Sequence, residues 1–276
     1  MESVVSTKWL NKELKNQDSN VIIFDTTWFS FKDAISEVYF QKHIVKAKYF
    51  DMTFGVKNSE KEPPTLPTPE TFEVNARRLA VNNDSHIVLY DATGKCGFFV
   101  AATVWWMFKL FGHEQVSVLD GGFEKWIADG YDTTDSLSMK KEEGDFSVKS
   151  LKKTWIKTFD EMKENLTGKT FQVCDSREHE AYCKGHYPDS INFPHSSLLN
   201  EETNCLKSVY ELKQLFADSD IELNKPIVTM STHGISSCAL ALAAYVCGCP
   251  NVAVFHGGFV EWKMKADLTL IEVTPE

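Results

Sequence analysis

The sequence predicts an α/β protein made of two similar domains, each a parallel sheet flanked by helices. The first observation is an internal repeat, because residues 116–126 match residues 252–262 around a shared Gly-Gly pair. A repeat of this length indicates a duplication. The second observation is that apolar strand-like segments alternate with longer helical segments in both halves, and this alternation is typical of parallel sheets.

Each half contains the same elements in the same order. An apolar strand ends in aspartate, a second apolar strand follows, and a long apolar helix ends before a glycine, which is the residue that most easily forms a left-handed C-cap. The predicted segments are 21–25, 87–90 and 101–111 before Gly112 in the first half, and 171–175, 227–230 and 238–247 before Gly248 in the second. The difference in residue number between equivalent segments of the two halves becomes smaller along the chain. The first half therefore has the longer loops.

The predicted domain boundary lies near residue 140. Residues 133–145 are polar, lack periodicity and follow the first Gly-Gly segment, which favours a linker. We therefore expect a first domain at 1–135, a linker at 136–146 and a second domain at 147–276. The proline-rich segment 62–69 lies inside the first half and is expected to be an exposed loop.

Composition excludes several classes of protein. The chain has 276 residues and a net charge of −10, which opposes binding to nucleic acids. Its apolar runs are shorter than the roughly 18 residues of a membrane span. Its seven cysteines are odd in number and lack a paired spacing, which favours a reducing compartment. No signal or transit peptide is visible at the N-terminus, so we expect a cytoplasmic rather than a mitochondrial protein.

The loop formed by residues 231–237 is the strongest candidate site. Ligands of parallel sheets bind beyond the carboxyl ends of the strands, and this loop follows the strand 227–230 and leads into a helix. A helix N-terminus points its amide groups and its positive dipole end at the loop, which suits an anion or a thiolate. The eight histidines are dispersed, and Cys247 and Cys249 lack a second pair, so we expect neither a metal nor another cofactor.

The segments 226–238 and 241–245 resemble the C-terminal loop and helix of tandem rhodaneses, the thiosulfate/3-mercaptopyruvate sulfurtransferases. Trp105-Trp106, Lys42-His43-Ile44 and Gly185-His186-Tyr187 also fall in the family's order, so the resemblance covers nearly the whole chain. It implies transfer of sulfane sulfur from thiosulfate or 3-mercaptopyruvate to a loop cysteine. That cysteine then passes the sulfur to cyanide, a thiol or a thioredoxin-like acceptor.

The chain departs from this family at the position of the nucleophile. Family loops read Cys-Arg-Lys-Gly-Val-Thr or Cys-Gly-Ser-Gly-Val-Thr, whereas this loop reads Ser-Thr-His-Gly-Ile-Ser and begins at Ser231. The family's anion-binding arginine falls on Ala181. Because oxygen cannot form a persulfide and a serine needs an adjacent base to attack anything, we expect a catalytically impaired or inactive enzyme.

Several alternatives remain open. Another cysteine, Cys96 or Cys183, would carry the sulfur in an active sulfurtransferase, or the chain would be a non-catalytic module that binds anions or proteins. A hydrolytic Ser231 with His233 as its base lacks a visible orienting acid. A phosphatase is disfavoured because Ser231 and Ser237 replace both ends of the Cys-x5-Arg signature. The predicted substrate-binding residues are Thr232, His233, Gly234, Ile235, Ser236, Ser237, Arg177, His43 and Asp33.

Overall fold

The computed structural model describes residues 2–28, 35–56, 62–94, 98–137 and 142–274. The chain divides into two compact units. The first unit comprises Met1–Lys57, Leu66–Lys152 and Glu201–Cys205, and the second comprises Asn58–Thr65, Lys153–Asn200 and Leu206–Glu276.

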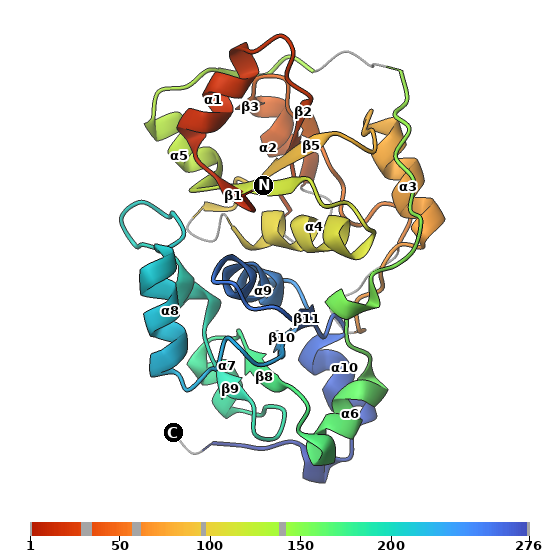
Figure 1. Ribbon diagram of the computed structural model, residues 1–276, viewed down its shortest axis with the longest axis vertical. Helices are drawn as coiled ribbons and strands as arrows, with labels where there is room; N and C mark the ends of the chain where they lie inside the picture. Colours follow the sequence, from red (N-terminus) through yellow and green to blue (C-terminus); the bar gives the residue numbers. More distant parts are fainter. Residues whose placement is uncertain (1, 29–34, 57–61, 95–97, 138–141, 275–276) are drawn as a thin grey trace. The chain divides into compact units, whose positions relative to one another are not determined.

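The first unit is built on a five-stranded parallel sheet with the strand order β1-β6-β5-β2-β4. These strands are β1 (Val4–Val5), β2 (Val21–Asp25), β4 (Lys48–Tyr49), β5 (His86–Tyr90) and β6 (Val116–Leu119). A short antiparallel pair, β3 (His43–Ile44) with β7 (Thr133–Thr134), lies outside this sheet. The helices of the unit are α1 (Thr7–Lys15), α2 (Ile35–Gln41), α3 (Pro69–Arg78), α4 (Phe99–Leu110) and α5 (Gly122–Ala128) (Figure 1).

The second unit repeats this plan with a four-stranded parallel sheet in the order β11-β10-β8-β9. Its strands are β8 (Gln172–Asp175), β9 (Ile191–Asn192), β10 (Ile227–Met230) and β11 (Val252–Val254). Its α-helices are α6 (Phe159–Gly168), α7 (His179–Cys183), α8 (Val209–Asp218), α9 (Ser236–Val246) and α10 (Gly258–Lys265) (Figure 1). Three short 3-10 helices are η2 (Lys153–Trp155), η3 (His195–Leu198) and η4 (Leu268–Leu270).

The predicted fold class is confirmed, since each unit is a parallel sheet flanked by helices. Strands β2 and β10 have the predicted bounds, and helices α4 and α9 begin two residues before the predicted starts. Gly112 and Gly248 follow these helices with φ of 90° and 91°, as expected of glycine at a left-handed helix end. Both helices are buried along nearly their whole length because they are apolar on all sides.

The duplicated tryptophans have equivalent roles in the two cores. The Trp126 indole donates to the Asp132 carbonyl over 3.0 Å, and the Trp262 indole donates to the Leu270 carbonyl over 3.0 Å. Both side chains are buried. Each indole therefore joins the apolar core to the chain that follows the last helix of the repeat, which satisfies its buried N–H group.

Part of the predicted linker packs on the first unit. Phe146 is 2% exposed, its amide donates to the Val81 carbonyl over 3.1 Å, and its carbonyl accepts from Arg77 Nε over 2.7 Å. The exact linker bounds stay a prediction. No helix among the described residues is long and apolar enough to cross a membrane.

Phe72→Ala should lower the free energy of unfolding of the first unit by about 3–5 kcal/mol, because the cavity it leaves cannot fully collapse. Phe72 is 1% exposed and its ring lies 4.1 Å from Phe111 and 5.0 Å from Phe108, between ring centroids. The matched control on the same helix is Val74→Ala, at a position that is 56% exposed, and it should change stability by about 0.5 kcal/mol or less. Urea unfolding followed by circular dichroism measures both. Equal losses would contradict this assignment of the core.

Candidate functional site

The loop between β10 and α9 leads directly into the N-terminus of α9. Ile235 occupies the N-cap position of α9 and supplies no side-chain hydrogen bond. The first amide groups of a helix have no carbonyl acceptor one turn earlier within the helix, and they lie at the positive end of its dipole. The Cys238 amide donates to the Ile235 carbonyl over 3.0 Å. The loop residues Ser231 and Gly234 are buried, Thr232 is exposed and His233 is partly buried.

Two glycines allow the loop to pack against the segment that follows β11. Gly234 has φ of +70°, and a Cβ placed there would lie 2.2 Å from the His256 carbonyl oxygen. A Cβ at Gly258 would lie 2.5 Å from the carbonyl oxygens of both Ser231 and Thr232. Only glycine fits such close backbone approaches, and the positive φ at Gly234 adds a second reason.

The start of α10 fixes the backbone of the loop. The Phe259 amide donates to the Ser231 carbonyl over 2.8 Å, and the Val260 amide donates to the Thr232 carbonyl over 3.2 Å. These bonds turn the first two carbonyls of the loop toward α10. The repeated Gly-Gly segment therefore supports the candidate site directly, a role that the sequence alone did not reveal.

The Ser231 hydroxyl lies in a cluster of hydroxyl groups. It is 2% exposed and its Oγ is 3.4 Å from Ser237 Oγ, while Ser237 itself is fully buried. Ser176 Oγ and Ser236 Oγ are 3.2 Å apart beside it, which joins the end of β8 to the start of α9. A hydroxyl whose hydrogen-bond partner is another hydroxyl is not activated as a nucleophile, because that step requires a base.

In the first unit, an aspartate stands at the position equivalent to Ser231. Asp91 follows β5 as Ser231 follows β10, and its Oδ2 accepts from the Ala101 amide over 2.9 Å near the start of α4. Its Oδ1 accepts from the Thr93 hydroxyl over 2.7 Å. Burial raises the pKa of Asp91 to about 6, so the group carries a negative charge at neutral pH. The Asp91 carboxylate thus occupies the Ala101 amide with a negative charge of the chain itself.

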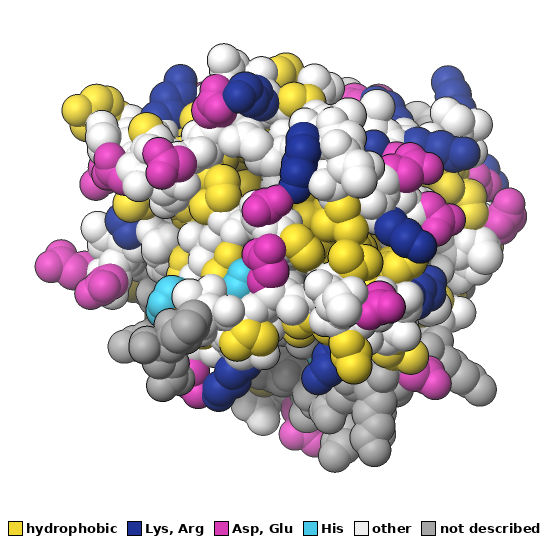
Figure 2. Space-filling model, turned by 90° about the horizontal axis from the view of Figure 1, so that it is seen from below, with side chains coloured by type: hydrophobic (Ala, Val, Ile, Leu, Met, Phe, Trp, Pro, Cys, Tyr) yellow, Lys and Arg dark blue, Asp and Glu magenta, His cyan; other side chains and the backbone are white. Residues whose placement is uncertain are grey.

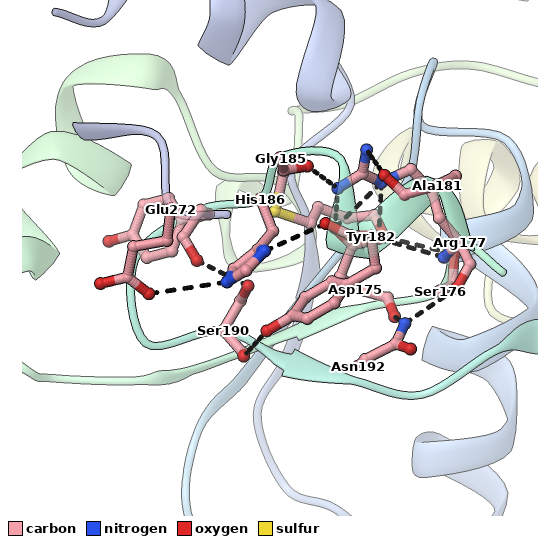
Figure 3. Close-up of polar contacts among 12 residues, drawn as sticks. Asp175, Ser176, Arg177, Ala181, Tyr182, Gly185, His186, Ser190, Asn192 and Glu272 are labelled. Carbon is pink, nitrogen blue, oxygen red and sulfur yellow. Dashed lines mark hydrogen bonds and ion pairs between the residues drawn. The ribbon is translucent and has the colours of Figure 1, made fainter. Parts of the chain in front are cut away.

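Arg177 is held by groups of the second unit (Figure 3). Its Nε is 3.0 Å from each carboxylate oxygen of Asp175, and its terminal nitrogens donate to the carbonyls of Ala181 over 3.2 Å and Gly185 over 2.8 Å. Its guanidinium also lies 4.1 Å from the centroid of the Phe259 ring. Because the charge of Arg177 is paired and its N–H groups donate to these carbonyls, Arg177 holds the chain at residues 181–185 in place. A contact between Arg177 and substrate stays a prediction.

His186 and His43 occupy equivalent positions in the two units. His186 Nδ1 donates to the Tyr182 carbonyl over 3.0 Å, and His43 Nδ1 donates to the Tyr39 carbonyl over 2.7 Å, each ring stacking on its tyrosine. His186 also faces Glu272, with 3.6 Å between Nε2 and Oε2 (Figure 3). His43 is fully buried, and its Nε2 has no hydrogen-bond partner among the described residues. Its role in substrate binding stays a prediction, and Asp33 and Cys96 lie outside the described residues.

His195 is a neighbour of the loop that the sequence analysis missed. Its Nδ1 is 3.1 Å from the Ser176 carbonyl and 3.6 Å from Glu178 Oε1. In the sequence, His195 is marked only by its position two residues after Phe193. That position does not distinguish a histidine near the site from an ordinary turn histidine. Cys238 donates to the Gly234 carbonyl over 3.2 Å, which agrees with a structural role in the helix. No metal-binding cluster occurs within the described ranges.

The charge of the chain is spread over its surface on the face shown in Figure 2, where acidic and basic side chains are intermixed. The net charge of −10 therefore acts as a general field on an approaching anion rather than as one local patch on this face.

Gly234→Ala should destabilise the second unit by at least about 2 kcal/mol, because it combines backbone strain with a contact that the His256 carbonyl cannot relieve. The control is Gly248→Ala, where φ is +91° but no atom lies within 4 Å of the added Cβ. That variant should lose only about 1 kcal/mol, the cost of the left-handed backbone alone. Urea unfolding compares the two, and a control loss as large as that of Gly234→Ala would count against the tight loop.

His256 should make the stability of the second unit depend on pH. Burial lowers the pKa of its imidazole from 6.5 to about 4, so the unfolded chain binds more protons between these values. The stability that the neutral His256 imidazole contributes is fully present above about pH 6.5 and is lost as the pH falls toward 4. From pH 7 to pH 5 the wild type should therefore lose about 2 kcal/mol more than His256→Gln. If the free energy of unfolding fell equally with pH in the wild type and in His256→Gln, the imidazole of His256 would not be shielded from water.

Comparison with known proteins agrees with this architecture. The protein-family model named Rhodanese-like domain matches residues 6–129 and 158–265 of the sequence. Thiosulfate sulfurtransferase of Gallus gallus is 36% identical over 277 residues, which cover 96% of this chain and 94% of that protein. The 3-mercaptopyruvate sulfurtransferase of Homo sapiens is 33% identical, with 96% and 93% covered.

A similar solved structure is that of SseA from Escherichia coli, described as a 3-mercaptopyruvate sulfotransferase with the rhodanese fold. It superposes with a TM-score of 0.82 at 28% identity, and the match covers 94% of this chain and 99% of that one. The sequence relatives thus span both halves of the duplication, and the solved structure has the same fold. The chain belongs to the rhodanese family and contains two rhodanese-like domains.

Proposed function

We propose that this chain is a sulfurtransferase-family protein that binds a small anionic sulfur donor, thiosulfate or 3-mercaptopyruvate, at the loop 231–237. Ser231 stands where the family places its persulfide-forming cysteine, so the protein is catalytically impaired or inactive at this loop. The relatives named as thiosulfate and 3-mercaptopyruvate sulfurtransferases support the class of donor. The positive dipole end of α9, which follows the loop directly, supports an anion at this place.

The observation that carries this proposal is the environment of the Ser231 hydroxyl. A persulfide requires a new bond between the donor's outer sulfur and a thiolate, which the oxygen of Ser231 cannot form. The hydroxyl's hydrogen bond goes to Ser237. The position at the start of the loop thus lacks the atom that completes sulfur transfer.

Donor binding at this loop would rest on backbone amide groups. Arg177 is paired with Asp175, and Ala181 has no side-chain donor to replace the family's arginine. Amide groups at a helix N-terminus attract anions of any kind, so affinity for thiosulfate is expected to be modest and to weaken with added salt.

The second candidate is a non-catalytic module, a pseudoenzyme that retains the cradle for an anion or a partner protein. Asp91 of the first unit favours it, because there a side-chain carboxylate accepts from an amide of the equivalent helix, where a bound anion would otherwise do so. A thioredoxin-like acceptor would be needed only if a thiol of this chain carries sulfur. Residence in the cytoplasm remains part of the proposal.

Ser231→Cys should raise thiocyanate formation from thiosulfate and cyanide by about tenfold or more over the wild type, because a thiolate replaces an unactivated hydroxyl. The wild type should stay near the background rate. Ser231→Ala is the matched control and should equal the wild type. A wild type with robust turnover would contradict the proposal: loss in Ser231→Ala would assign catalysis to Ser231, and no loss would assign it to another residue.

A further inference from the structure

A cysteine, a histidine and an asparagine form a second group of reactive side chains in the second unit. Cys183 Sγ lies 3.4 Å from His179 Nε2, and His179 Nδ1 lies 3.0 Å from Asn192 Oδ1. His179 and Cys183 are the first and last residues of α7, and this spacing of four places both on one face of the helix. Asn192 comes from β9.

The contacts of Asn192 determine which nitrogen of His179 carries the proton. The Asn192 amide nitrogen donates to the carbonyls of Asp175 over 3.2 Å and Arg177 over 2.8 Å. Its Oδ1 is therefore the atom that faces His179, and an oxygen of this kind only accepts. His179 Nδ1 must donate, so the neutral ring presents the lone pair of Nε2 to the Cys183 thiol.

This arrangement has the elements of an activated nucleophile, namely a thiol, a base within contact distance and a third group that orients the base. The Asn192 amide is itself anchored on the ends of β8, so the imidazole is oriented by the sheet rather than by a mobile side chain. Among the described residues, Cys183 is the cysteine that contacts an imidazole oriented by a third group. Burial also raises the pKa of the Cys205 and Cys247 thiols.

We propose that Cys183, with His179 as its base and Asn192 as the orienting group, is a second reactive site that accepts sulfane sulfur from small inorganic persulfides. His179 Nε2 takes the thiol proton, and the Cys183 thiolate attacks the sulfane sulfur of a hydrodisulfide ion, HSS⁻. A new S–S bond forms at Cys183, the S–S bond of the donor breaks, and the electron pair leaves with HS⁻. The proton on His179 then passes to the leaving group, which departs as hydrogen sulfide.

The surroundings of the thiol restrict the donor to a small one. Cys183 is 4% exposed, whereas the His179 side chain beside it is exposed. The C-terminal segment lies against the same turn, since the Thr274 amide donates to the Cys183 carbonyl over 3.2 Å. A donor of two sulfur atoms fits this restriction better than an organic persulfide. The step does not involve Ser231, so it is independent of the proposed donor site at the loop 231–237.

The test treats the full-length protein with sodium disulfide, Na₂S₂, then traps persulfides with iodoacetamide and follows each cysteine peptide by mass spectrometry. Cys183 should gain sulfur about tenfold or more faster than Cys205, although Cys205 is the more exposed of the two. Cys205 reacting as fast as Cys183, or Cys183 remaining unmodified, would overturn the proposal. This comparison is made within the wild type and depends on no variant.

Variants then assign the base. His179→Gln should slow sulfur uptake at Cys183 by about tenfold or more, because it removes the proton acceptor. Glu180→Gln is the matched control on the same helix turn, where Glu180 pairs with Lys184, and it should have no effect. An unchanged rate in a folded His179→Gln protein would overturn the role of the base. The assay contains neither thiosulfate nor 3-mercaptopyruvate and reads each cysteine separately, so a failure here is distinct from a failure of the proposed donor site.

Discussion

The hydrogen bonds between α10 and the loop after β10 are the constraint on which the candidate site depends. They turn the carbonyls of Ser231 and Thr232 toward the amides of Phe259 and Val260. These two bonds fix the backbone of the loop just before the positive dipole end of α9. The close approach at Gly258 permits this arrangement, so the Gly-Gly repeat is as much a part of the site as the loop itself.

The two units differ in the residue that follows the equivalent strands β5 and β10. The residue after the second strand is Asp91 in the first unit and Ser231 in the second. The Asp91 carboxylate accepts from the Ala101 amide of α4, whereas the shorter Ser231 side chain contacts the hydroxyl of Ser237. The two positions therefore differ in side-chain length and charge, although each follows the equivalent strand of its sheet.

The sequence predicted the fold well because its signals are local and repeated. The strands that end at Asp25 and Met230 and the glycines after α4 and α9 all follow from periodicity and helix-end chemistry. The site was predicted only in part. The loop could be located from the order of strand and helix, but the partners of Arg177 could not, because they depend on how the chain between β8 and β9 turns back.

Cys183 illustrates the limit of sequence analysis most clearly. Its spacing from His179 could be read directly, yet a pair at this distance on a helix is common and says nothing of the tautomer. That information comes from Asn192, which is fixed by two carbonyls at the end of β8 and the start of the next turn. The orientation of the base is thus a property of the sheet register between β8 and β9, where Asp175 pairs with Asn192. The proposed reactivity of Cys183 therefore depends on the carboxyl end of β8, which also positions Ser176 beside the loop 231–237.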